Sequence, residues 1–205
     1  MRKFLAIAGV VMAGSAAASA QPPSDLHTRL SEIKQVDTPL GLTRIPDAEG
    51  DGREMMVFHS WRENGNAWGY GVFMMTMTSR AHRDPYESAW DIVGIASEPK
   101  GGLKHEVTDQ PHTGEDDLKV VRFVRAKLDG KVDTFLVTAI RNPPGAAPDP
   151  VVAEIRIYAL RNHEDEEVGT TPDSFDPVFA FTTTKSYSDA DDALLDELGL
   201  PLPKG

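Results

Sequence analysis

The chain contains no cysteine among its 205 residues. This absence excludes disulfide bonds, cysteine nucleophiles, thiolate metal sites and c-type haem attachment. No apolar run of membrane-spanning length follows residue 20, so no transmembrane helix is expected in residues 21–205. A domain of this length buries a sizeable core, which must stabilise the fold without covalent cross-links.

The chain also has fewer basic residues than acidic ones. The chain has 21 lysine and arginine residues against 32 aspartate and glutamate residues, which gives a formal net charge of −11 at pH 7. A surface of this sign repels nucleic acids and anionic membranes, because both are polyanions. The composition therefore argues against a nucleic-acid partner.

The N-terminus has the pattern of a cleavable secretory signal peptide. Two basic residues precede an apolar stretch at residues 4–12, and a run of small residues ends at Ala20. The apolar stretch is too short to span a membrane as a helix. The pattern predicts cleavage near Ala20 and Gln21, export to the periplasm or the medium, and a single β-rich domain over residues 21–205.

Most of the remaining chain has the composition and spacing of β-strands. The Asp-Gly pair at 129–130 predicts a tight hairpin, and a second hairpin is predicted across the Asn- and Gly-containing segment 62–66. Residues 106–117 and the proline-rich residues 142–150 are predicted loops. The predicted strands span residues 54–61, 67–79, 90–96, 118–128, 132–141, 151–159 and 178–184.

Apolar residues at helical spacing occur near both ends of the predicted domain. Residues 25–34 predict a short first helix. Residues 189–198 predict a final helix with Ser188 as its N-cap, acidic residues in its first turn and Gly199 at its end.

The order of elements shows no βαβ alternation, no internal repeat and no linker. It predicts a mainly β (α+β) fold, namely an antiparallel β-sandwich or curved sheet of about seven strands with a short C-terminal helix.

An acidic, Gly-rich segment precedes the first predicted hairpin. Asp47, Glu49 and Asp51 alternate and Gly52 follows, as at the start of a loop that binds Ca²⁺ through oxygen ligands from alternate positions. An EF-hand loop has a glutamate at its twelfth position, where this chain has Phe58. Two interpretations follow, a degenerate calcium site formed by the three carboxylates and an acidic turn that leads into a strand.

No catalytic motif stands out. The six histidines lack the spacing of a helix-borne zinc site, and neither G-x-S-x-G nor S-x-x-K with its partner motifs is present. We therefore expect a non-enzymatic protein, against the competing hypothesis of a hydrolase whose site no motif reveals. The Met- and aromatic-rich residues 61–77 have two interpretations, a buried core and an exposed surface for a ligand.

Two segments point to a family. An acidic turn (DAEGDG, 47–52) and an apolar strand (MMVFHS, 55–60) lead into RENGNAWGYGVF (62–73). The tail KSYSDADDALLDEL (185–198) places an aromatic, Asp- and Ala-rich pattern before the final helix. With the signal peptide and the compact β domain, this order of segments resembles the secreted carbapenem intrinsic-resistance proteins, the CarG-like family.

The resemblance implies a non-catalytic periplasmic protein that lets cells tolerate a β-lactam without hydrolysing it. It also implies a binding role for Arg62, Asn64, Asn66 and Trp68, although the family usually has a histidine where Trp68 stands. The alternative is a periplasmic domain that binds calcium or a small ligand. The expected partners are a small molecule or another periplasmic protein.

Overall fold

The fold is described by a computed structural model. It describes residues 22–65, 69–79, 90–97, 101–109, 117–163 and 171–203. The predicted signal peptide and its cleavage site lie outside the described residues. Neither described helix is long and apolar enough to cross a membrane.

The described residues form twelve strands and two helices. In chain order these are α1 (Leu26–Arg29), β1 (Leu30–Val36), β2 (Gly41–Ile45), β3 (Met55–Arg62), β4 (Tyr70–Thr78), β5 (Trp90–Ile92), β6 (Gly94–Ser97), β7 (Gly101–Lys104), β8 (Glu106–Thr108), β9 (Lys119–Leu128), β10 (Lys131–Arg141), β11 (Val151–Asn162), β12 (Asp173–Tyr187) and α2 (Ala190–Leu198).

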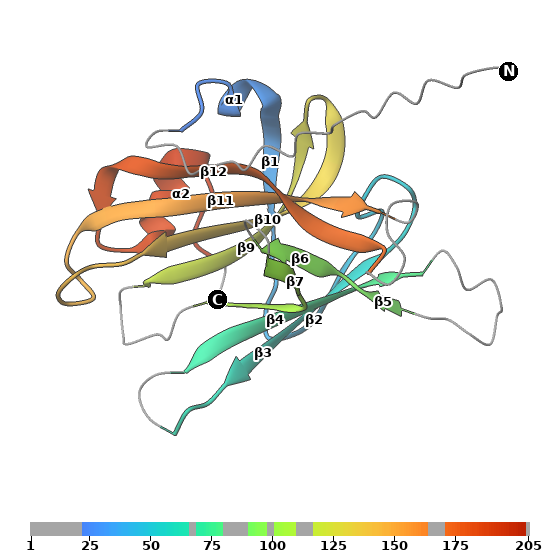
Figure 1. The fold of residues 1–205 in the computed structure, drawn as a ribbon, viewed down its shortest axis with the longest axis horizontal. Helices are drawn as coiled ribbons and strands as arrows, with labels where there is room; N and C mark the ends of the chain where they lie inside the picture. The colour runs from blue at the N-terminus through green and yellow to red at the C-terminus, as the bar shows by residue number, and fades with distance from the viewer. Residues whose placement is uncertain are drawn as a thin grey trace, which may run out of the picture.

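The strands form two sheets that pack against each other (Figure 1). The larger sheet has the order β1-β9-β10-β11-β12-β6-β7, and the smaller has the order β2-β3-β4-β5 with β8 paired to β4. Only β12 and β6 pair in parallel among the described strands. The predicted mainly β fold with a short C-terminal helix is therefore confirmed, with more strands than the sequence predicts.

The larger sheet is buried on both faces. One face packs against α2 and the other against the smaller sheet. Along β10, Phe135 and Val137 face the helix, whereas Leu136 between them faces the smaller sheet. Burial on both faces explains why the central strands are almost continuously apolar instead of alternating.

A β-bulge changes the face that β12 presents. Ile157 pairs with Phe179 but the next residue, Tyr158, pairs with Pro177, so β12 has one extra residue at this point. As a result Phe175 packs toward the smaller sheet, whereas Phe179 packs toward α2.

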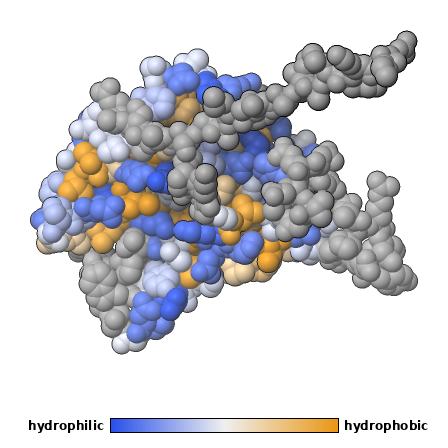
Figure 2. Space-filling view, in the orientation of Figure 1, coloured by the Kyte–Doolittle hydropathy of each residue, from blue (hydrophilic) through white to orange (hydrophobic). Residues whose placement is uncertain are grey.

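Figure 2 shows that the outer surface on one side of the molecule is largely hydrophilic, with small hydrophobic patches between.

Both predicted hairpins are confirmed. β3 and β4 pair along their whole length, from Met55 with Met77 to Arg62 with Tyr70. β9 and β10 are joined by Asp129 and Gly130, whose φ angles are 51° and 86°. Positive φ at both central residues is the geometry of a type I′ turn, which is the reason for the Asp-Gly signal.

The predicted helix over residues 25–34 is wrong. Only Leu26–Arg29 is helical, and Leu30–Val36 is β1, which pairs with the edge of β9. The helical spacing of Leu26 and Leu30 reflects burial on the same side, in the core against α2. Pairing with an open sheet edge supplies more hydrogen bonds than an isolated short helix, so tertiary context decides here.

Three smaller expectations need correction. Asp189, not Ser188, is the N-cap of α2, since its side chain accepts a hydrogen bond from the amide of Asp191. The predicted loop 106–117 begins with β8, and residues 110–116 lie outside the described residues. The predicted strand 90–96 divides at Val93 into β5 in the smaller sheet and β6 in the larger one.

Candidate functional site

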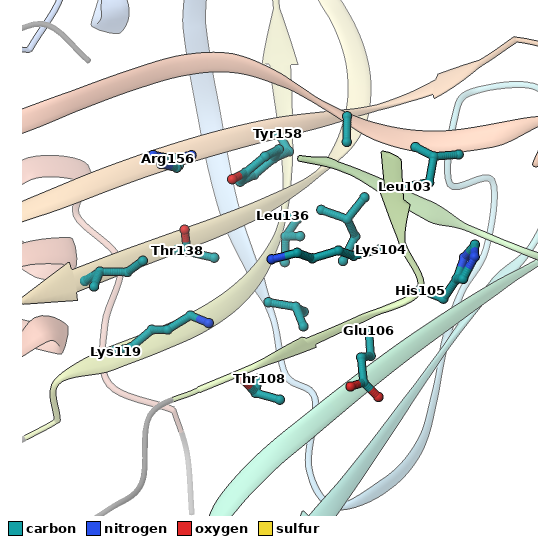
Figure 3. A pocket seen from close by; sticks show the side chains of 14 residues that line it. Leu103, Lys104, His105, Glu106, Thr108, Lys119, Leu136, Thr138, Arg156 and Tyr158 are labelled. Carbon is teal, nitrogen blue, oxygen red and sulfur yellow. The ribbon is translucent and has the colours of Figure 1, made fainter. Parts of the chain in front are cut away.

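A cavity of about 700 Å³ lies between central strands of the larger sheet and the short strands that follow Val93 (Figure 3). Strands β9, β10 and β11 form one wall, and β6, β7 and β8 form the other. The chain crosses from β5 in the smaller sheet to β6 and β7 at the end of the larger sheet, and then returns to the smaller sheet as β8. The volume is within the range of about 300–1,000 Å³ that is typical of small-molecule sites.

Part of the lining is apolar. Leu136 on β10 is fully buried, and Leu103 on β7 and Ile140 on β10 extend this apolar surface. The hydroxyl groups of Thr138 and Tyr158 lie along the same wall. The wall therefore offers apolar contact area together with a few polar groups that can orient a ligand.

The rest of the lining is positively charged. Lys104 on β7, Lys119 on β9 and Arg156 on β11 line the cavity, and the two ammonium groups extend into it from different sides (Figure 3). Burial lowers the pKa of Lys119; the charge of Asp109 opposes this shift and that of Lys104 adds to it. Within the described part of the chain, neither lysine forms an ion pair. Arg156 donates to Glu154 Oε1 at 2.6 Å through Nε.

A second cavity, of about 340 Å³, lies beside the end of β1. His59 lines it; its Nδ1 is 2.8 Å from the Thr38 carbonyl oxygen and its ring stacks on Phe73 at 4.1 Å. Arg122 and Asp191, which form an ion pair, line the other side.

Acidic groups gather next to this ion pair. Carboxylate oxygens of Asp117, Asp189 and Asp191 lie within 4.8 Å of one another, the one such group found among the described residues. Burial raises the pKa of Asp191 to about 6; the charges of Asp117 and Asp189 add to the shift and Arg122 opposes it. The Arg122 guanidinium thus neutralises part of the cluster, and Asp189 is engaged in capping α2.

The carboxylates of the acidic turn face an arginine of their own chain. Asp47 Oδ1 accepts a hydrogen bond from the Gly52 amide at 2.7 Å. Arg53 donates to Glu49 Oε2 at 2.8 Å and to Asp51 Oδ2 at 2.6 Å. A guanidinium therefore lies where the calcium hypothesis requires the carboxylates to bind an ion, and calcium binding stays one of the two interpretations of this turn.

The predicted binding residues lie elsewhere. Arg62 ends β3 with its guanidinium 5.2 Å from the centre of the Tyr70 ring, and Asn64 follows in the exposed turn. Neither is among the described residues that line the two cavities. Asn66 and Trp68 lie outside the described residues. Because strand residues rise by about 3.3 Å each, β3 separates Arg62 from the acidic turn by roughly 20 Å.

The Met- and aromatic-rich hairpin contains both core and surface. Met55, Met75 and Met77 are completely buried. In contrast, Phe58 and Met74 are each 41% exposed and are direct partners across β3 and β4. The two interpretations of this stretch therefore apply to alternate residues of the same strands.

Sequence reasoning missed the larger cavity. Lys104, Lys119 and Arg156 come from three strands that are distant in the sequence, and no motif links them. The available signal is weak: Glu154 and Arg156 occupy polar positions of an alternating strand, which predicts a polar environment on that face but does not identify its neighbours.

Comparison with known proteins supports the fold only. No protein-family model matches the chain, and no curated protein matches it. Among solved structures, the chain is similar to the "Crystal structure of CarG", with a TM-score of 0.62, 16% sequence identity, and coverage of 80% of this chain and 94% of that chain. The structural relationship agrees with the resemblance noted from the sequence; at this identity it concerns the arrangement of strands.

Proposed function

We propose that this chain is a non-catalytic periplasmic protein that protects the cell against a carbapenem. The observation that carries the proposal is the shared fold with CarG, which extends over 94% of the CarG chain. The segments 47–73 and 185–198, which resemble the same family, support it independently. The export predicted from the N-terminal sequence is consistent with it, because β-lactams act on targets in the periplasm.

The test compares carbapenem susceptibility of a sensitive bacterial host with and without the full chain. We expect a higher inhibitory concentration with the protein. A variant without residues 2–20 is the control, since it retains the domain and loses the predicted export signal. Unchanged susceptibility with the exported protein contradicts the proposal.

The non-catalytic part has its own test. The purified protein is incubated with a chromogenic β-lactam, and we expect no hydrolysis above buffer. Measurable turnover refutes this part and favours the competing hydrolase hypothesis.

A second candidate function is the binding of a small ligand without a protective role. The cavity of about 700 Å³ favours it, because apolar walls with a few placed polar groups are typical of ligand sites. The susceptibility experiment separates the two candidates, since a ligand-binding domain without a protective role leaves the inhibitory concentration unchanged.

A further inference from the structure

The larger cavity concentrates positive charge in an acidic protein. The whole chain has a net charge of −11, yet three cationic side chains line this one cavity. Glu106 is the acidic side chain among its described lining residues, and its carboxylate is turned away from both ammonium groups in Figure 3. A cleft of one sign with low-dielectric walls focuses the potential and attracts the opposite charge.

One of the two lysines is placed at an energetic disadvantage. Lys119 is half-buried, and transfer of an ammonium from water into a partly apolar site is unfavourable unless the charge is paired. Lys104 directs a second positive charge into the same space and adds to the lowering of the Lys119 pKa, whereas the charge of Asp109 opposes it. An anion between them relieves both effects, which gives the ligand a direct contribution from electrostatics.

We infer that this cavity binds a small organic carboxylate, with its oxygens between the ammonium groups of Lys104 and Lys119 and its apolar body against Leu103 and Ile140. Arg156, on the adjacent wall, is paired with Glu154, so the inference rests on the two lysines. This inference goes beyond the protective function and does not depend on it, because it rests on the lining of the cavity alone.

The same lining determines the ligand class. The apolar wall formed by Leu103 and Ile140 favours a ligand with an apolar body over inorganic phosphate or sulfate. The net negative charge of the rest of the protein disfavours polyanions such as nucleic acids. A compact monoanion satisfies both conditions, and a carbapenem, which carries one carboxylate, is a member of this class.

The first experiment compares two probes of equal shape by titration calorimetry with the full chain after export. 2-Naphthoate carries the carboxylate, and 2-naphthamide replaces it with an uncharged amide. We expect 2-naphthoate to bind about tenfold more tightly or better, because hydrogen bonds to charged groups are stronger than those between neutral groups. Equal affinity for the two probes, or no binding of 2-naphthoate, overturns the inference.

The second experiment locates the site. Lys104→Gln and Lys119→Gln are each expected to weaken 2-naphthoate binding about tenfold while they leave 2-naphthamide binding unchanged. Lys131→Gln is the matched control, since it removes the same charge from an exposed position at the start of β10, and it is expected to bind like the parent protein. Lys104 is exposed, so its variant reports on binding even where the Lys119 variant folds poorly. Equal losses in all three variants overturn the inference.

The outcomes separate this inference from the protective function. Carboxylate-selective binding that depends on Lys104, together with unchanged carbapenem susceptibility, upholds the cavity and refutes protection. Raised tolerance without any preference for 2-naphthoate upholds protection and refutes the cavity. A direct titration with a carbapenem then shows whether the cavity accepts this carboxylate-bearing compound.

Discussion

Arg53 forms a two-point ion pair with Asp173, although 120 residues separate them in the chain. The two hydrogen bonds are 2.7 and 2.8 Å long, and the Asp173 side chain is completely buried. The same guanidinium also holds Glu49 and Asp51 of the acidic turn. This arrangement ties the turn before β3 to the first residue of β12, and so joins the smaller sheet to the larger one.

Replacement of Arg53 by methionine is expected to lower the free energy of unfolding by about 3–5 kcal/mol, because it removes the cation from the buried Asp173 carboxylate and leaves it the hydrogen bond from Asn162. Urea denaturation measures the change. Arg44→Met is the control, since Arg44 pairs with Glu54 while 61% of its side chain is exposed, and exposed pairs contribute less than about 1 kcal/mol. Equal losses for the two variants contradict the structural role of Arg53.

Calcium is expected to leave the melting temperature of the parent protein unchanged at millimolar concentration. The Arg53 guanidinium already neutralises Glu49 and Asp51, and a ligand stabilises a protein only when it binds the folded state. Thermal melts with calcium and with a chelator test this. A calcium-dependent rise that Asp47→Asn abolishes establishes instead the calcium site predicted from the sequence.

Asp191 is expected to make the protein less stable as the pH rises from about 4 to above 6. Burial raises its pKa from 3.8 to about 6, with Asp117 and Asp189 adding to the shift and Arg122 opposing it. The folded state therefore binds the proton more tightly than the unfolded state, so this contribution to stability is complete below pH 3.8 and is lost as the pH rises through about 6.

The measurement is urea denaturation at several pH values for the parent protein and Asp191→Asn. Relative to this variant, the parent is expected to lose up to about 3 kcal/mol across that interval. Asp192→Asn, at the neighbouring exposed position of α2, is expected to follow the parent curve. Parallel curves for the parent and Asp191→Asn rule out the effect.

The parts of the fold that the sequence predicts are those with local causes. The Asp129-Gly130 turn follows from two residues that accept positive φ, and α2 follows from apolar spacing with Gly199 in the left-handed conformation at its end. The apolar spacing predicts a helix where β1 forms, because the strand depends on pairing with the edge of β9, nearly a hundred residues further along the chain. Such pairing leaves no local signal in the sequence.

The candidate site is less predictable for the same reason. The acidic turn has a local motif that the sequence shows. The partner of its carboxylates is Arg53, and the ion pair of Arg53 with the distant Asp173 appears only in the folded structure. The cavity depends on three cations from separate strands and on the switch of the chain between sheets at Val93. Register and sheet order fix both, and neither is encoded in a short segment.

Arg141 offers a last prediction, because it is a buried arginine whose described hydrogen bonds all go to backbone carbonyls. Its residue exposure is 1%, and its guanidinium donates at 2.8–3.1 Å to the carbonyl oxygens of Tyr187, Asp117, Ala147 and Asp149. Arg141→Met removes these donors and leaves the acceptors without partners, so we expect a loss of about 3 kcal/mol or more in urea denaturation. Hydrogen exchange is expected to accelerate within the proline-rich residues 142–150, which the arginine holds against β12.

Arg141→Lys keeps the charge but lacks the planar fork of donors, and we expect it to recover less than half of the loss. Arg62→Met, at an exposed position, is the control and is expected to unfold like the parent. Full recovery by lysine contradicts this account, since it makes the charge, and not the set of hydrogen bonds, the source of stability.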